Sequence, residues 1–238
     1  MTLIPIHSGQ IPLALDAQQQ PGFDLFVIGG NGAACENAKK IATGDLQSNL
    51  YLWGATGTGV THLLQAACKL AAEQGRQTAY IPLREHADLD PGMLENMEVL
   101  DLVCVDDIDQ IGGQPAWEQA LLHLYNRRRD SKHSVLIGAH ASPQNLELGL
   151  PDLKSRMAWD LVYHLKALAD EDKIELLQRR AAARAFSLPQ DVAAYLVTRV
   201  RRDPHHLIAL LDKLQNATLA EKRKLTVPFV KSILDKTP

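Results

Sequence analysis

Gly54-Ala55-Thr56-Gly57-Thr58-Gly59-Val60-Thr61 is the most informative segment of the sequence. It follows the short apolar run Leu50-Tyr51-Leu52-Trp53, and after it apolar residues recur at helical spacing. A strand, a glycine-rich turn and a helix in this order form a loop whose backbone N–H groups can surround a phosphate. The sequence therefore predicts a phosphate-binding loop.

The loop departs at one position from the pattern G-x-x-x-x-G-K-[ST]. Val60 stands where the pattern has lysine, whereas Thr61 keeps the hydroxyl that faces Mg²⁺. Lysine would offset charge on the β- and γ-phosphates, and Val60 offers neither charge nor donor. We therefore expect little intrinsic nucleoside triphosphatase activity and binding of a nucleoside diphosphate. The alternative is a degenerate loop that binds nothing.

A second apolar run, Leu102-Val103-Cys104-Val105, ends in Asp106 and Asp107. In a phosphate-loop protein we expect such a strand to lie beside the loop strand, with its first acid in the Mg²⁺ shell. Thr61 and Asp106 are therefore the predicted Mg²⁺ residues. The alternative is a capped strand end without a ligand.

Strand and helix patterns alternate through the first two thirds of the chain, which predicts an α/β fold with a parallel sheet covered on both faces. Beyond residue 170 only helical patterns occur, which predicts a small all-α domain. The predicted strands are 50–53, 78–83, 101–107, 134–138 and 161–165. The predicted helices are 33–43, 60–74, 92–99, 115–129, 170–185, 189–201, 204–220 and 227–235.

Three regions follow from these patterns. Residues 1–22 lack periodicity and are predicted to be a flexible arm. Residues 23–167 form the predicted nucleotide-binding α/β domain, and residues 168–238 form the predicted helical domain. Within the arm, Gln10-Ile11-Pro12-Leu13-Ala14-Leu15 is apolar, so it either folds back on the domain or binds a partner's pocket as a linear motif.

Composition excludes several classes of protein. A net charge of -3 and a pI near 6.3 argue against bulk nucleic-acid binding by the whole molecule. The three cysteines, Cys35, Cys68 and Cys104, show no C-x-x-C spacing, so neither a disulfide framework nor a zinc site is indicated. We find no signal-peptide pattern or membrane-spanning apolar run, and we expect a cytoplasmic protein without a membrane partner.

Arginines at two places in the chain could have either a structural role or a role in contacting another molecule. Arg156, in Leu153-Lys154-Ser155-Arg156, follows the last loop of the α/β domain, where it could contact a phosphate on a neighbouring molecule or form a surface salt bridge. Arg127-Arg128-Arg129 ends a predicted helix, where cations suit the helix dipole, and could instead face a partner.

Several segments resemble bacterial DnaA initiators and their AAA+ relatives: Phe23-Asp24-Leu25-Phe26-Val27-Ile28-Gly29, Leu102-Val103-Cys104-Val105-Asp106-Asp107-Ile108 and Leu153-Lys154-Ser155-Arg156. Others resemble the Hda family of DnaA paralogues, which inactivates DnaA: Gln10 to Leu15 and residues 51–53, 148–153 and 225–231. The resemblance covers nearly the whole chain. It implies an AAA+ phosphate-loop domain followed by a helical lid.

The resemblance also implies a function. Arg156 would act in trans as an arginine finger on ATP bound to DnaA, and residues 10–15 would bind the sliding clamp of DNA polymerase III. DNA would then be contacted indirectly, through the clamp. The result would be hydrolysis of DnaA-bound ATP and negative regulation of replication initiation. The bound nucleotide, ADP or another nucleoside diphosphate, would be structural, and a homo-oligomer is compatible with this scheme.

The predicted nucleotide-binding residues are Phe26, Val27, Ile28, Gly54, Thr56, Gly57, Thr58, Gly59, Val60, Thr61, His62 and His205. His205 stands where relatives carry a lid arginine and would bind phosphate only when protonated, so a capping or surface role is the alternative. His140 stands at a polar sensor position where relatives have an acid. Two other functions remain open, an adaptor that recruits a replication factor without stimulating hydrolysis, and an independent nucleoside triphosphatase.

Overall fold

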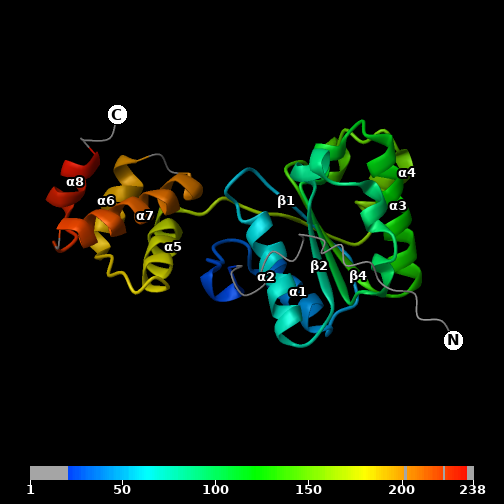
Figure 1. Cartoon of the computed structure of the whole chain (residues 1–238), viewed down its shortest axis with the longest axis horizontal. Helices are drawn as coiled ribbons and strands as arrows, with labels where there is room; N and C mark the ends of the chain where they lie inside the picture. Colours follow the sequence, from blue (N-terminus) through cyan, green and yellow to red (C-terminus); the bar gives the residue numbers. More distant parts are fainter. Residues whose placement is uncertain (1–20, 201–202, 222, 235–238) are drawn as a thin grey trace.

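The computed structural model describes residues 21–200, 203–221 and 223–234. An α/β domain and a helical domain lie at opposite ends of the molecule (Figure 1). The sheet has five strands in the order β2-β3-β4-β1-β5, and every neighbouring pair is parallel. The predicted fold class, a parallel α/β domain followed by a helical domain, is confirmed. The strands are β1 (Leu50–Trp53), β2 (Thr78–Pro82), β3 (Leu102–Asp106), β4 (Ser134–Ala139) and β5 (Leu161–His164).

The predicted position of the acid-ending strand is wrong. β4 lies between β1 and β3, so the strand that ends at Asp106 is not the neighbour of the loop strand. Gly138 of β4 explains how the acid still approaches the loop. A Cβ at Gly138 would clash with the Asp106 carboxylate and would lie 2.9 Å from Val60 Cγ1. The glycine therefore leaves room for both side chains across the intervening strand.

Helices cover both faces of the sheet because side chains alternate along each strand. Leu50 and Leu52 point into one apolar cluster with residues of α1 (Gly32–Thr43) and α2 (Val60–Glu73). Tyr51, between them, points into a second cluster with residues of α3 (Pro115–Asp130) and α4 (Pro151–Arg156). The loop therefore connects a strand and a helix that are both anchored in the core.

The helix predicted at residues 92–99 is replaced by two 3₁₀ turns, Pro91–Leu94 and Met97–Val99. Asn96 lies between them with φ at 62°, in the left-handed region, which interrupts any continuous helix. The first turn is capped by Asp90, whose Oδ1 accepts from the Gly92 N–H at 2.6 Å. The local sequence therefore favours short turns over one helix.

Arg128 fixes the end of α3 to the rest of the domain. It is completely buried, and its guanidinium donates to the carbonyl oxygens of Met97 at 2.7 Å, Leu100 at 2.9 Å and Ser134 at 2.6 Å. Neither of the two roles considered for these arginines, complementing the helix dipole or facing a partner, describes the hydrogen bonds of Arg128. Arg128 joins α3 to β4 and to the turn that precedes β3.

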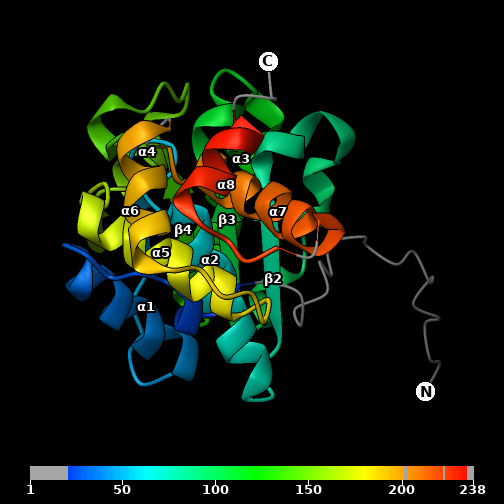
Figure 2. The ribbon, with the colours of Figure 1, turned by 90° about the vertical axis from the view of Figure 1, so that its left-hand side faces the viewer.

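The helical domain contains α5 (Asp170–Ala182), α6 (Gln190–Arg199), α7 (Pro204–Glu221) and α8 (Val227–Leu234) around a separate apolar cluster. Figure 2 shows these helices in front of the sheet domain. Arg179 of α5 donates to the carbonyls of Asp24 and Phe26, which ties the helical domain to the segment before α1. Within the described ranges, no helix is long and apolar enough to cross a membrane. The boundaries at residues 22 and 167 stay predictions.

Candidate nucleotide site

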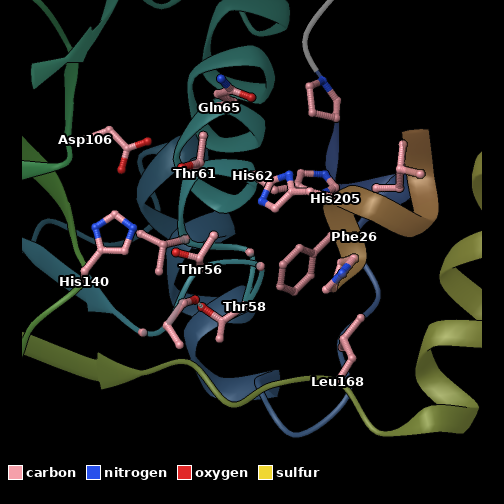
Figure 3. A pocket seen from close by; sticks show the side chains of 18 of the residues that line it. Phe26, Thr56, Thr58, Thr61, His62, Gln65, Asp106, His140, Leu168 and His205 are labelled. Carbon is pink, nitrogen blue, oxygen red and sulfur yellow. Dashed lines mark hydrogen bonds between the residues drawn. The ribbon is translucent and has the colours of Figure 1, made fainter. Parts of the chain in front are cut away.

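A cavity of about 490 Å³ lies at the carboxyl ends of the strands, between the glycine loop and helices α5 and α7 (Figure 3). This volume falls within the range of sites for small molecules and cofactors. Asp106 and His140 lie on the sheet side of the loop, and Phe26 and His205 lie on the side of the helical domain. A ligand in the cavity would therefore contact both domains.

The loop takes its shape from two glycines. Gly57 and Gly59 have φ angles of 85° and 99°, in the region that favours glycine. A Cβ at Gly59 would lie 2.8 Å from the Phe26 ring, so the ring contacts the loop backbone directly. The Thr58 hydroxyl donates to the Ala55 carbonyl at 2.8 Å. These contacts hold the loop in place immediately before α2 begins at Val60.

Nearly all the predicted nucleotide-binding residues meet at this cavity. Ile28 does not line it, and its side chain is 45% exposed. Arg156 lies elsewhere, and residues 10–15 lie outside the described part of the chain. The predicted residues that line the cavity are Phe26, Val27, Gly54, Thr56, Gly57, Thr58, Gly59, Val60, Thr61, His62, Asp106 and His205.

Two buried acids form the floor of the cavity. Asp106 accepts from the Tyr80 hydroxyl at 2.7 Å and from the Asp107 N–H at 3.0 Å. Burial, together with the charge of Asp106, raises the pKa of Asp107 to about 6. The oxygens of Asp106 and Thr61 are hard ligands of the kind Mg²⁺ prefers. In the described residues no cluster of three or more His, Cys, Asp or Glu could hold a metal by itself, so these two residues fit Mg²⁺ only together with phosphate oxygens.

Two arginines of the cavity were missed by sequence reasoning. Arg84 follows the carboxyl end of β2, where ligands of parallel sheets bind, and this position was an available signal. Arg180 comes from α5, and no local pattern indicated it. Its Nε is buried without a hydrogen-bond partner, and burial lowers the pKa of its guanidinium. Arg180 therefore brings a positive charge, and a donor without a partner, to the lid side of the cavity.

His62 connects Arg180 to the segment before α1. Its Nε2 lies 2.9 Å from the Gly22 carbonyl oxygen, and its Nδ1 lies 3.3 Å from Arg180 Nη2. Burial lowers the pKa of His62 to about 4, so the ring is neutral at pH 7. The Nε2–H therefore donates to Gly22, and Nδ1 accepts from Arg180. The Phe26 ring meets His62 edge-on, with centroids 5.3 Å apart.

His140 and His205 are placed differently. The backbone N–H of His140 donates to Asp109 at 2.8 Å, and its ring Nδ1 lies 3.2 Å from the same carboxylate. His205 is exposed at the start of α7, where its backbone N–H donates to Asp203 at 3.2 Å. Pro204 lies 3.0 Å from a Cβ built on Gly57, so this end of α7 meets the loop. The ring of His205 can therefore reach a ligand held by the loop.

Arg156 ends α4, on the part of the α/β domain far from the helical domain (Figure 1). Its guanidinium carbon lies 3.8 Å from the centroid of the Trp159 ring. Its Nε is buried without a hydrogen-bond partner. It is thus separated from the chain's own cavity.

Two family matches divide the chain at the same place as the structure. Residues 17–164 match the bacterial DnaA ATPase domain, and residues 170–234 match the lid domain of Hda. The chain belongs to the Hda family of DnaA paralogues. This family is known for inactivating DnaA, and its α/β domain belongs to the AAA+ nucleotide-binding class. The helical domain described above is accordingly the Hda lid.

Solved structures support the same fold for this Hda-family chain. Domain III of DnaA from Thermotoga maritima is 24% identical with a TM-score of 0.81, and the match covers 95% of this chain and 100% of that one. DnaA from Aquifex aeolicus bound to AMPPCP is 22% identical with a TM-score of 0.69, covering 83% and 65%. The RuvB Holliday junction branch migration motor of Thermotoga maritima is 17% identical with a TM-score of 0.65, covering 85% and 68%.

Proposed function

We propose that this chain inactivates DnaA by supplying Arg156 in trans to ATP bound on DnaA, in the presence of the DNA-loaded sliding clamp. Residues 10–15 bind the clamp, which places the chain behind the replicase. The products are ADP-bound DnaA and inorganic phosphate, and re-initiation is prevented. An arginine finger contributes roughly 10³–10⁵ in rate, so a protein with a poor catalytic site of its own can still control another's.

The observation that carries this proposal is the state of the Arg156 side chain. Among the described residues its side chain makes no hydrogen bond or ion pair; its Nε is buried, and its guanidinium lies over the Trp159 ring. Arginine donates in a planar fork that matches phosphate oxygens. A guanidinium without protein acceptors retains that fork for a ligand outside the chain.

The chain's own cavity holds a nucleoside diphosphate with a structural role in this proposal. The cavity is lined by both the α/β domain and the lid, so a ligand there stabilises one against the other. Val60 supplies no charge to a γ-phosphate, which disfavours hydrolysis in this site. With a diphosphate bound, Thr61 and Asp106 would hold Mg²⁺, which would neutralise phosphate charge.

The test measures hydrolysis of radiolabelled ATP bound to DnaA, with clamp-loaded DNA and this chain as wild type, Arg156→Ala or Arg156→Lys. We expect Arg156→Ala to lose stimulation by roughly 10³-fold, and Arg156→Lys to lose at least about tenfold because lysine lacks the fork. Arg199→Ala removes an exposed lid arginine and serves as the matched control. Equal stimulation by wild type and Arg156→Ala would reject the finger, and stimulation by neither would favour an adaptor.

The clamp contact is tested separately. A fluorescent peptide of residues 7–16 is titrated with the clamp, beside a peptide in which Leu13 and Leu15 are replaced by alanine. We expect saturable binding of the first peptide only. Equal binding of both peptides, or of neither, would remove the clamp from the proposal and leave the role of Arg156 to its own test.

A further inference from the structure

Trp159 occupies an unusual position for a large aromatic residue. Its side chain lies at the surface with 54% of its area exposed. The indole N–H donates to the Ser155 hydroxyl at 3.2 Å, which fixes the ring one turn from that residue. The Arg156 guanidinium carbon lies 3.8 Å from the ring centroid, and that of Arg129 lies 5.9 Å from it. The ring therefore attracts two cations.

A carboxylate close to Arg156 in the chain, that of Asp160, is held by other groups. Asp160 lines the same small crevice as Arg156, yet its Oδ2 accepts from the Tyr125 hydroxyl at 2.8 Å and from the Asn49 amide at 2.8 Å. Asn49 is held in turn, because its Oδ1 accepts from the Val135 N–H at 2.9 Å. Asp160 thus accepts from neutral donors through Oδ2, and no ion pair between it and Arg156 is found among the described residues.

We propose that Trp159 is a positioning residue that holds the Arg156 guanidinium, by stacking, in the orientation in which it meets the phosphate of a nucleotide carried by a second protein. This inference rests on the proposed function of Arg156. Arg156 and Arg129 place two cations around the Trp159 ring, and Arg129 also lies 3.6 Å from the Asp130 carboxylate. The ligand that fits it is the polyphosphate of a nucleotide exposed at the edge of a partner.

Stacking suits this task better than an ion pair would. A carboxylate would occupy the two-pronged face of the guanidinium, and that face would have to be released before it could meet phosphate. The face of an indole ring attracts the cation through its quadrupole and accepts no N–H in the guanidinium plane. The side chain is thus restrained while its Nη nitrogens remain available, although its Nε is buried.

The experiment measures stimulation of DnaA-bound ATP hydrolysis over a concentration series of this chain, so that the maximal rate and the half-maximal concentration are separated. Trp159→Leu, Trp159→Phe and Ser155→Ala are compared with wild type and with Arg156→Ala. Leu219→Ala, which truncates a 69% exposed residue of the lid, is the matched control. Urea unfolding of each variant shows whether it is folded.

We expect Trp159→Leu to lower the maximal rate about tenfold at an unchanged half-maximal concentration, as loss of a cation–π contact predicts. Trp159→Phe keeps an aromatic face and should stay within roughly threefold of wild type. Ser155→Ala should give a smaller loss of about twofold, because it removes one neutral hydrogen bond from the ring. The effect follows the aromatic face rather than the volume of the side chain.

Other results separate the two ideas. If Arg156→Ala is inactive but Trp159→Leu matches wild type, the positioning role is overturned and the finger stands. If Trp159→Leu changes only the half-maximal concentration, Trp159 contacts the partner directly and does not position Arg156. If Arg156→Ala is fully active, the proposed function itself fails. Ser155→Ala remains informative if Trp159→Leu does not fold.

Discussion

The ends of α3 and α4 each carry an arginine, and the two side chains are used in opposite ways. Arg128 is completely buried, and three carbonyl oxygens accept its donors. Arg156 is half-buried and stacks on Trp159, with no acceptor among the described residues. Each lies in a short basic segment at the end of a helix, Arg127-Arg128-Arg129 or Lys154-Ser155-Arg156. What distinguishes a structural arginine from one available to a ligand is therefore where its donors go.

Arg180 lies between these extremes. One of its nitrogens meets the neutral ring of His62, and its Nε has no partner. It also lines the cavity, whereas Arg128 and Arg156 do not. The three arginines are therefore expected to differ in what their substitution changes. Loss of Arg128 should act on stability, and loss of Arg180 on nucleotide binding.

The largest expected effect follows from Arg128→Met, which keeps much of the apolar stem but removes every donor. The carbonyls of Met97, Leu100 and Ser134 would stay buried without that partner. Each unsatisfied buried group costs about 1–3 kcal/mol. We expect the free energy of unfolding to fall by about 3–5 kcal/mol, measured by urea denaturation.

The matched variant for that measurement is Arg156→Ala. Its guanidinium lies over Trp159, a contact worth about 0.5–1 kcal/mol, and its side chain also lines the crevice with Tyr125 and Asp160. We therefore expect its free energy of unfolding to stay within about 1 kcal/mol of wild type. Equal destabilisation by both substitutions would mean that the number of hydrogen bonds each arginine makes does not determine its contribution to stability.

The sequence was sufficient for the elements that depend on local pattern. Apolar runs and helical spacing located all five strands and most helices, and the glycine spacing located the loop. The order of strands in the sheet depends on long-range packing, so the insertion of β4 between β1 and β3 was missed. The turns at 91–99 were missed because Asn96 adopts a left-handed conformation that its residue type permits but does not impose.

The candidate site was predictable to the same degree. The loop residues and Asp106 follow strands, and their meeting at the carboxyl edge of a parallel sheet is a general property of such folds. Arg180 reaches the cavity from the lid, 118 residues after His62 in the chain. Arg128 and Arg129 are neighbours in sequence, yet one is buried and the other faces Trp159. Tertiary packing decides both cases.

A smaller effect is expected from Arg180→Leu. If the unused Nε serves a ligand, the substitution should weaken ADP binding by about tenfold, the effect of one charge-assisted hydrogen bond. Arg180 contacts His62 and shares the lid side of the cavity with Phe26 and Leu176, so we expect pyrophosphate, which lacks the nucleoside, to bind almost unchanged. Isothermal titration calorimetry with both ligands measures the difference.

Arg184→Leu is the control for that titration. Arg184 also has a buried nitrogen without a partner, but it pairs with Asp212 and does not line the cavity. We expect its ADP affinity to match wild type. An equal loss in both variants would show that the lid responds to any lost arginine and that the unused donor of Arg180 is not a ligand contact.

The smallest expected effect is the pH dependence contributed by His62. Burial lowers its pKa in the folded protein to about 4, below its ordinary value of about 6.5 in an unfolded chain. The unfolded state therefore binds more protons in this interval, so this contribution to stability is present above pH ~6.5 and is lost as pH falls toward 4. Protonation would also place a second cation beside Arg180 and remove the acceptor at Nδ1, whereas Asp24 nearby favours the protonated ring.

His62→Gln isolates this contribution, because glutamine does not titrate and can both donate and accept. Asp107 has the opposite effect on stability. Its pKa is raised to about 6 in the folded protein, so protonation of its buried carboxylate at lower pH favours the folded state. Asp107 is present in both proteins, so its titration cancels in the difference between them. We expect the free energy of unfolding to fall by about 1 kcal/mol more in wild type than in His62→Gln between pH 7 and 5.5. Parallel curves would mean that His62 is solvated in the folded protein and that its contact with Arg180 does not link the lid to α2.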